Sequence, residues 1–222
     1  VNCLLIFIII TGAIFFAGGD LLLFIFTLTL ASIFLVVAAF SSNSPYAQVG
    51  AERELLQMMA YEPMVLLTAI GFYMVNGSFN VSDVVTSDVM GIVYLPGIFL
   101  GFVFILTIKL RKSPFDLSLS HHGHQELVKG LSTEFSGKTL AIIELAHWYE
   151  NIFLLGVVYL FIAHSAVWSP IIAVLVCLVV YFLEVLIDNN YARMKWQFAI
   201  NSSWVVALTL GFVNMLVLYF IG

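Results

Sequence analysis

The sequence predicts an all-α, polytopic transmembrane helical bundle that forms a single domain over residues 1–222. Of these residues, 62% are hydrophobic and only 9% are charged. The mean hydropathy is +1.09. A water-soluble domain of this size would have to expose most of that apolar surface. The apolar residues form several runs of about 20 residues, the length that crosses a hydrocarbon core of about 30 Å as a helix.

Apolar runs and the polar breaks between them predict about seven spans. In chain order, the spans are expected at 1–17, 20–40, 54–76, 90–110, 139–164, 169–187 and 199–221. No stretch is typical of a cleaved signal peptide, because the hydrophobicity is not concentrated at the start of the chain. Cys3 and Cys177 lie in apolar runs without metal-binding spacing, so we expect both to be reduced thiols.

The connections between the spans predict the orientation. If they alternate across the membrane, loops 41–53, 111–138 and 188–198, with the span ends that adjoin them, hold all 8 basic residues of the chain. By the positive-inside rule, that side is the cytoplasm. The opposite connections carry only acids among their charged residues, namely Asp20, Asp83 and Asp88.

Several ionisable residues fall within the expected spans, where each costs free energy unless it is paired, protonated or hydrated. Glu62 lies roughly 12 Å along its helix. Pro63 follows it, so we expect a kinked or interrupted helix whose carbonyls water can reach. Glu144 and His147 are three residues apart and share a helix face. We therefore expect a hydrated, proton-active role for Glu62 and Glu144.

Other ionisable residues near the span ends leave two interpretations open. Glu150, Glu184 and Asp188 are compatible with a proton-active role and equally with interface or helix-end charges whose side chains reach water. His164 lies close to the outer boundary, which favours a surface position.

The longest polar stretch is SPFDLSLSHHGHQELVKGLSTEFSG, residues 113–137. Its histidines and acids are metal-ligand types. However, His121, His122 and His124 are too closely spaced to supply three ligands from one regular element, and no second cluster completes a tetrahedral set. We expect no metal site here.

Two long stretches carry a resemblance to a known family. The first contains PFDL at 114–117, ELVKG at 126–130 and TEFSG at 133–137, and the second is SSNSPYAQVGAERELLQMMAYEP at 41–63. Both resemble the membrane subunit that anchors the peripheral arm of respiratory complex I, a family shared with energy-converting NiFe hydrogenases. The insert SLSHHGHQEL, together with SSNSPYA and AYEP, resembles the ferredoxin-linked, Ech-type hydrogenase branch. Leu119 and His121 replace acids of the quinone-reducing branch, so no quinone site is carried over.

The resemblance implies a function for the chain. It would be the membrane subunit of a ferredoxin-linked, ion-translocating hydrogenase complex in a prokaryotic plasma membrane. Loop 111–138 would dock the soluble arm, and the subunit would couple redox chemistry to H⁺ or Na⁺ movement. The family has eight spans, so the resemblance also implies one further helix before Val1.

The resemblance also implies the cofactors and partners. No cofactor is expected in this chain, which lacks the cysteine pairs that ligate clusters, whereas a NiFe centre and iron–sulfur clusters would lie in partner subunits. The expected partners are the NiFe hydrogenase large subunit, the iron–sulfur small subunit, antiporter-like membrane subunits, lipid and, indirectly, ferredoxin, with no nucleic acid. The chain itself would be a non-redox subunit of a multi-subunit oxidoreductase.

The candidate site residues form two sets. The expected proton or ion relay comprises Glu62, Glu144, His147, Glu134, Glu126, Asp116 and the counter-charge Arg53. The expected docking set comprises Ser113, Pro114, Phe115, Asp116, His121, His122, His124, Glu126 and Lys129. Histidine titrates near physiological pH, so these loop charges could respond to the state of a docked partner.

Three other interpretations stay open. In one, the loop only holds the arm and all ion transport lies in antiporter-like neighbours. In another, the chain is the equivalent subunit of a proton-pumping dehydrogenase that uses a quinone or phenazine. In the third, the chain is a stand-alone secondary transporter. The sequence argues against this interpretation, because it has no clear inverted repeat and contains a large polar loop.

Overall fold

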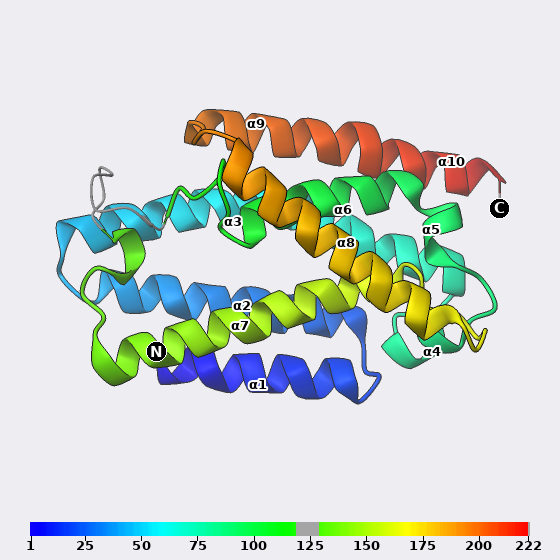
Figure 1. Cartoon of the computed structure of the whole chain (residues 1–222), viewed down its shortest axis with the longest axis horizontal. Helices are drawn as coiled ribbons and strands as arrows, with labels where there is room; N and C mark the ends of the chain where they lie inside the picture. The colour runs from blue at the N-terminus through cyan, green and yellow to red at the C-terminus, as the bar shows by residue number, and fades with distance from the viewer. Residues whose placement is uncertain (119–128, 222) are drawn as a thin grey trace.

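The computed structural model describes residues 1–118 and 129–221, and the regular structure within these ranges is helical. The elements are α1 (Asn2–Phe16), α2 (Leu21–Phe40), α3 (Pro45–Asn76), α4 (Val81–Thr86), α5 (Gly91–Tyr94), α6 (Pro96–Lys109), the 3₁₀ turn η1 (Gly130–Ser132), α7 (Gly137–Leu160), α8 (Ser169–Asn190), α9 (Trp196–Val206), the π-helical η2 (Ala207–Phe212) and α10 (Val213–Ile221). Most of the long helices run roughly along the same axis (Figure 1).

The described residues form the all-α membrane bundle that the sequence predicts. Five segments are long and apolar enough to cross a membrane: α2, α3, α7, α8 and the continuous run through α9, η2 and α10. Two shorter apolar helices, α1 and α6, stand where two further spans were expected. In Figure 1, α1 and the α9–α10 run lie along opposite long sides, and α8 crosses obliquely over α6 and α7.

Helix α3 differs from the predicted span 54–76 in where it begins. It starts at Pro45, because a proline at the first helical position has the required φ and needs no N–H partner. It ends at Asn76, and the next residue, Gly77, has a φ of 70°, the left-handed conformation common after helices. Pro63 lies inside the helix, so of the two expected outcomes, a kink or an interruption, the interruption does not occur.

The predicted span 90–110 is divided in two. Proline disfavours the helical conformation of the residue before it, and Leu95, directly before Pro96, has φ −118° and ψ 41°. The short helix α5 therefore ends there and α6 begins. Only α6 continues inward to the charged residues at 109–112.

Close backbone approach joins α6 to the C-terminal run. A Cβ on Gly97 would lie 2.6 Å from the carbonyl oxygen of Leu210 in η2, so only glycine fits there. Small residues serve this purpose between membrane helices, where packing rather than water exclusion holds the helices together.

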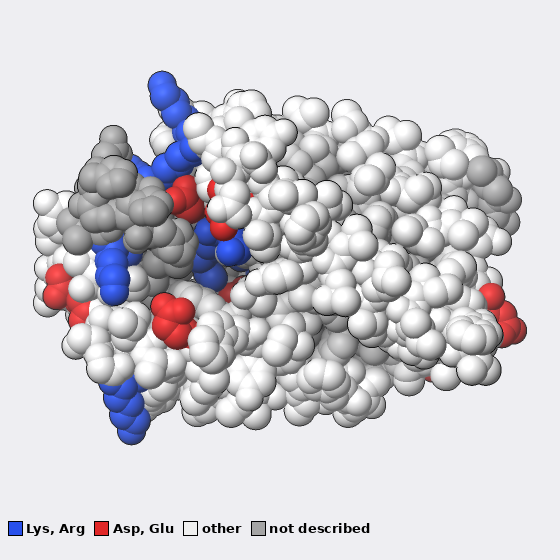
Figure 2. Space-filling model, viewed as in Figure 1, with Lys and Arg blue, Asp and Glu red and all other residues white. Residues whose placement is uncertain are grey.

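The two ends of the bundle differ in charge. Figure 2 shows lysine and arginine gathered at one end, with acids alone among the coloured residues at the other. The basic end is built by the α2–α3 connection, residues 110–118, η1, the start of α7 and the α8–α9 connection. Large apolar side chains on α8, including Leu178 and Phe182, are exposed, as expected for a surface that meets lipid or another membrane subunit.

Candidate functional site

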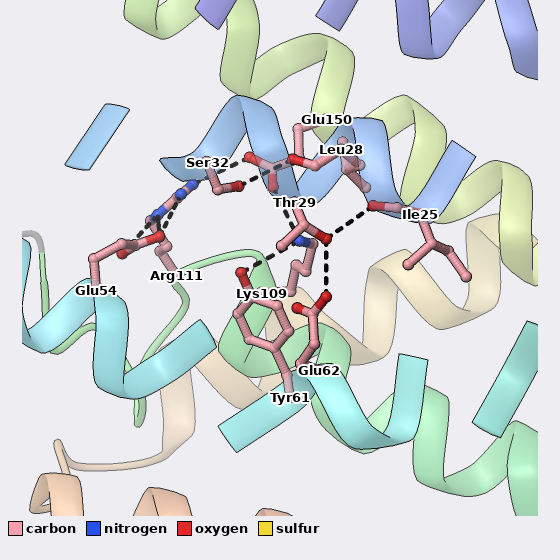
Figure 3. A network of polar contacts seen from close by, with 10 residues as sticks. All are labelled: Ile25, Leu28, Thr29, Ser32, Glu54, Tyr61, Glu62, Lys109, Arg111 and Glu150. Atoms are coloured by element: carbon pink, nitrogen blue, oxygen red, sulfur yellow. Dashed lines mark hydrogen bonds and ion pairs between the residues drawn. The ribbon is translucent and has the colours of Figure 1, made fainter. Parts of the chain in front are cut away.

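Four charged side chains are buried together near the basic end of the bundle (Figure 3). Glu54 of α3 and Glu150 of α7 are 2% and 5% exposed, and Lys109 and Arg111, at the end of α6 and just after it, are 5% and 7% exposed. Charges buried in a membrane bundle are costly unless they are paired, and they commonly mark ion pathways.

Arg111 lies at the centre of this group. Its Nη2 is 2.6 Å from Glu54 Oε1, and its Nε donates to the same carboxylate at 3.1 Å. Its Nη1 donates to Glu150 Oε2 at 3.3 Å. One guanidinium therefore holds carboxylates from two helices. Its backbone has φ 53°, the left-handed region that non-glycine residues seldom adopt.

Lys109 extends the group away from Arg111. Its ammonium lies 3.6 Å from Glu150 Oε1 and donates to the Tyr61 hydroxyl at 3.3 Å. The same ammonium lies 4.4 Å from the centroid of the Tyr61 ring, a cation–π contact. Lys109 thus shares Glu150 with Arg111.

Glu62 adds a fifth charge beyond Lys109, whose electrostatic partners include it. The Thr29 hydroxyl lies 3.0 Å from Glu62 Oε1 and 2.8 Å from the Ile25 carbonyl oxygen. The two acceptor oxygens share the single hydroxyl hydrogen of Thr29. The Thr29 hydroxyl therefore links the Glu62 carboxylate to the backbone of α2 (Figure 3).

These five residues form what we call the charge row: Glu54, Arg111, Glu150, Lys109 and Glu62. Their formal charges alternate in sign along it. Because Glu54 and Glu62 are eight residues apart on α3, the row spans roughly 12 Å of that helix. The sequence approach identified Glu62 and left Glu150 open, but it missed the other three.

Two sequence signals could have found the missing members. Lys109 lies in the apolar run 90–110, where the rule applied to Glu62 applies equally. Glu54 and Tyr61 are seven residues apart, which places both on one helix face. Which charges pair could not be read from the sequence, because Arg111 is 57 and 39 residues from its two partners.

Glu144 and His147 line a cleft beside the charge row. The cleft has a volume of about 230 Å³ and is also lined by Leu110, Arg111, Lys112, Trp148 and Asn151. Glu144 is exposed, whereas His147 Nε2 is buried and has no hydrogen-bond partner among the described residues. The shared face predicted for the pair therefore leads from the surface to Arg111.

The described part of the docking loop, residues 111–118 and 129–138, is held against α3, the end of α8 and the α8–α9 connection. Ser113 N donates to Asp188 Oδ1 at 2.8 Å, and Arg193 Nη2 donates to the Asp116 carbonyl oxygen at 2.7 Å. Gln57 Nε2 of α3 donates to the Phe115 carbonyl oxygen. The loop is thus tied to the helix that carries Glu54.

The structure places the other predicted residues differently. Pro114, Phe115 and Asp116 are buried, so the expected charged surface does not include the Asp116 side chain, which pairs with Arg193 at 3.3 Å. Glu134 and Lys129 are exposed, and Ser113 and Arg53 are partly exposed. His121, His122, His124 and Glu126 lie outside the described residues. Among the residues that the structure does describe, no group of three histidine, cysteine or acidic side chains could hold a metal ion.

The fold and the charge row define the class: a multi-pass helical membrane protein with ionisable groups paired inside its bundle. Residues 1–219 match the family model described as NADH dehydrogenase, and the chain belongs to that family.

Similar proteins come from different complexes. One subunit of the NADH-quinone oxidoreductase of Anoxybacillus flavithermus is 31% identical, over 93% of this chain and 65% of its own length. Hydrogenase-4 component C of Escherichia coli is 28% identical, over 88% of this chain and 65% of its length. The chain thus spans about two thirds of the length of these relatives. The archaeal membrane-bound sulfane sulfur reductase shares the fold, with a TM-score of 0.72 at 20% identity over 89% of this chain and 70% of the matched chain.

Proposed function

We propose that this chain is the membrane subunit of a ferredoxin-linked, ion-translocating hydrogenase complex in a prokaryotic plasma membrane. It anchors the soluble hydrogenase arm through the docking loop and couples the arm's redox chemistry to H⁺ or Na⁺ movement. The similarity to hydrogenase-4 component C supports the hydrogenase assignment. The partners in this proposal are the NiFe large subunit, the iron–sulfur small subunit and antiporter-like membrane subunits.

The observation that carries the proposal is the direct connection between the docking loop and the charge row. Arg111 belongs to both, because it pairs with Glu54 and Glu150 and is two residues before Ser113. Gln57 joins the loop, through Phe115, to α3, the helix that carries Glu54 and Glu62. A partner that moves this loop would change the field that Arg111 exerts on both carboxylates.

This chain's residues supply the ion-handling part of the mechanism. When Arg111 moves away from Glu150, that carboxylate loses a cation and becomes a better proton acceptor. Lys109 then keeps Glu62 as its remaining carboxylate neighbour, so the change at Arg111 reaches the far end of the charge row. Water in the cleft lined by Glu144 and His147 provides the exchange with the cytoplasmic side. The NiFe centre and clusters, in partner subunits, supply the redox step.

The test measures ion transport per molecule of hydrogen evolved. The Glu62→Gln and Glu144→Gln variants should assemble and evolve hydrogen, yet build a smaller ion gradient for each hydrogen formed. Glu52→Gln is the matched control, because Glu52 is an exposed acid on the same helix as Glu62. Normal gradients in both variants would remove the relay from the proposal and leave the loop as an anchor alone.

A second candidate is the equivalent subunit of a quinone- or phenazine-linked dehydrogenase. An apolar cleft of about 270 Å³ favours it, beside the docking loop and lined by Phe104, Thr107, Pro114, Phe115, Ile187, Tyr191, Met194 and Phe198. Such a lining suits an apolar ring system. Co-purification with a large subunit bearing two CxxC pairs supports the hydrogenase, whereas electron transfer to added quinone supports the dehydrogenase.

A further inference from the structure

Glu184 of α8 is a buried acid that lies outside the charge row. Glu184 is 0% exposed. Neither of its carboxylate oxygens has a hydrogen-bond partner among the described residues. The preceding Phe182 and Leu183 are exposed, so α8 turns its apolar face outward and Glu184 inward. A carboxylate in such a place loses its hydration and gains no bond in return.

The charged groups that act on Glu184 include Lys112 and Asp188. Asp188 lies one helical turn further along α8, on the same face. It is already occupied, because Lys112 Nζ lies 3.2 Å from its Oδ2 and Ser113 N donates to its Oδ1. Lys112 therefore acts electrostatically on both Glu184 and Asp188, but it forms an ion pair only with Asp188.

We propose that Glu184 is a second proton-binding site and that Lys112 switches it by exchanging Asp188 for Glu184. While Lys112 is paired with Asp188, Glu184 holds its proton as a neutral acid. When the docking loop shifts, the Ser113 hydrogen bond and the Lys112 ion pair to Asp188 break together. Lys112 then turns to Glu184, whose O–H bond breaks, and the proton passes to water.

The released proton has a nearby route. Lys112 lines the cleft of about 230 Å³ that Glu144 and His147 also line. The ammonium of Lys112 keeps its own protons throughout, and Asp188 returns to water as an anion. The role of this switch in ion transport rests on the proposed function, but the protonation of Glu184 does not, because it follows from packing in this chain.

The experiment labels the purified, intact complex with dicyclohexylcarbodiimide, an apolar reagent that reacts with protonated carboxylic acids, and locates the product by peptide mass spectrometry. Glu184 should be labelled, whereas Glu54, held as an anion by Arg111, should not. Asp188→Asn frees Lys112 and should lower labelling of Glu184 severalfold. The double variant Asp188→Asn with Lys112→Met should restore it.

A second measurement covers the case in which the reagent does not reach Glu184. The infrared difference spectrum between the native complex and Glu184→Gln should contain the C=O band of a protonated carboxylic acid, and Asp188→Asn should weaken that band. Labelling and band both unchanged by Asp188→Asn would overturn the switch. No label together with no band would overturn the proton site. Neither readout requires electron flow, so a complex that lacks hydrogenase activity can still confirm or refute this inference.

Discussion

At the scale of single residues, Arg111 decides the geometry of the charge row. A buried ion pair is not stabilising by itself, because desolvation offsets the attraction. Burial disfavours the charge of Arg111, but the carboxylates of Glu54 and Glu150 outweigh it and raise the pKa of the guanidinium above its ordinary value. Its left-handed backbone adds a cost of about 1–3 kcal/mol. The paired carboxylates therefore offset the costs of burial and backbone strain at Arg111.

Replacing Arg111 by Met should leave two carboxylates buried without their principal cation. Losing one partner of a buried pair costs about 3–5 kcal/mol. We expect a clearly lower thermal unfolding midpoint of the detergent-solubilised complex, measured by the fluorescence of a thiol-reactive or tryptophan probe. Lys138→Met is the matched control, because it removes one positive charge from an exposed position. Equal midpoints for the two variants would mean that the row is hydrated rather than mutually paired.

Single residues also show the limit of sequence reasoning. The rule that ionisable groups inside spans are functional candidates identified Glu62, which the structure places at one end of the charge row. The same rule would have reached Lys109. It could not choose between a buried and a snorkelling position for Glu150, because that depends on Lys109 and Arg111, whose positions are set by a different helix.

At the scale of elements, α3 connects the docking loop to the membrane interior. It carries Glu54, Gln57, Tyr61 and Glu62, and it packs against η1 through Gly50. A Cβ on Gly50 would overlap the Leu131 backbone nitrogen, closer than atoms can approach. The position of η1, and with it the second half of the docking loop, therefore depends on a glycine in α3.

Gly50→Ala should displace η1 and weaken attachment of the soluble arm. A forced extra methyl group in a packed contact costs about 1–3 kcal/mol, and here the obstacle is backbone that cannot rotate away. We expect less of the partner subunits to co-purify with the membrane arm, measured by quantitative mass spectrometry. Val49→Ala, an exposed neighbour on the same helix, serves as control. If as much of the partner subunits co-purifies with Gly50→Ala as with the unchanged protein, the position of η1 does not contribute to docking.

The elements were predicted in number and order more accurately than in their ends. Apolar runs located the seven apolar helical segments of the described residues, because hydrocarbon thickness fixes their length. The early start of α3 was missed since residues 45–53 are polar and helical, which an apolar-run criterion cannot detect. Pro96 offered a local signal for the break before α6. The π-helical η2 offered none, since its close contacts, Leu210 with Gly97 and Gly211 with Met64, join residues far apart in the sequence.

At the scale of the whole molecule, the charge asymmetry read from the sequence is the asymmetry of the folded bundle (Figure 2). Asp83 lies in α4 at the acidic end. There, hydrogen bonds from Ser78 and Asn80 lower the pKa of Asp83, so it remains an anion at neutral pH. Asp88 at that end accepts a hydrogen bond from Ser165 at 2.6 Å. Asp83 and Asp88 are thus held by neutral donors, whereas Glu54, Glu150 and Asp188, towards the basic end, pair with lysine or arginine.

This asymmetry predicts the orientation of the bundle in the membrane. Lysine and arginine are retained on the cytoplasmic side, so the docking loop should face the cytoplasm and the α7–α8 connection the outside. With Cys3 and Cys177 replaced by Ser, single-cysteine variants Lys138→Cys and Val167→Cys place a thiol at each end, and Val167 is 89% exposed. A membrane-impermeant maleimide added to intact cells should label Val167→Cys at once, but Lys138→Cys only after the cells are permeabilised. The reverse pattern would put the docking loop outside, where no cytoplasmic ferredoxin-linked arm could reach it, and the proposed function would fail with it.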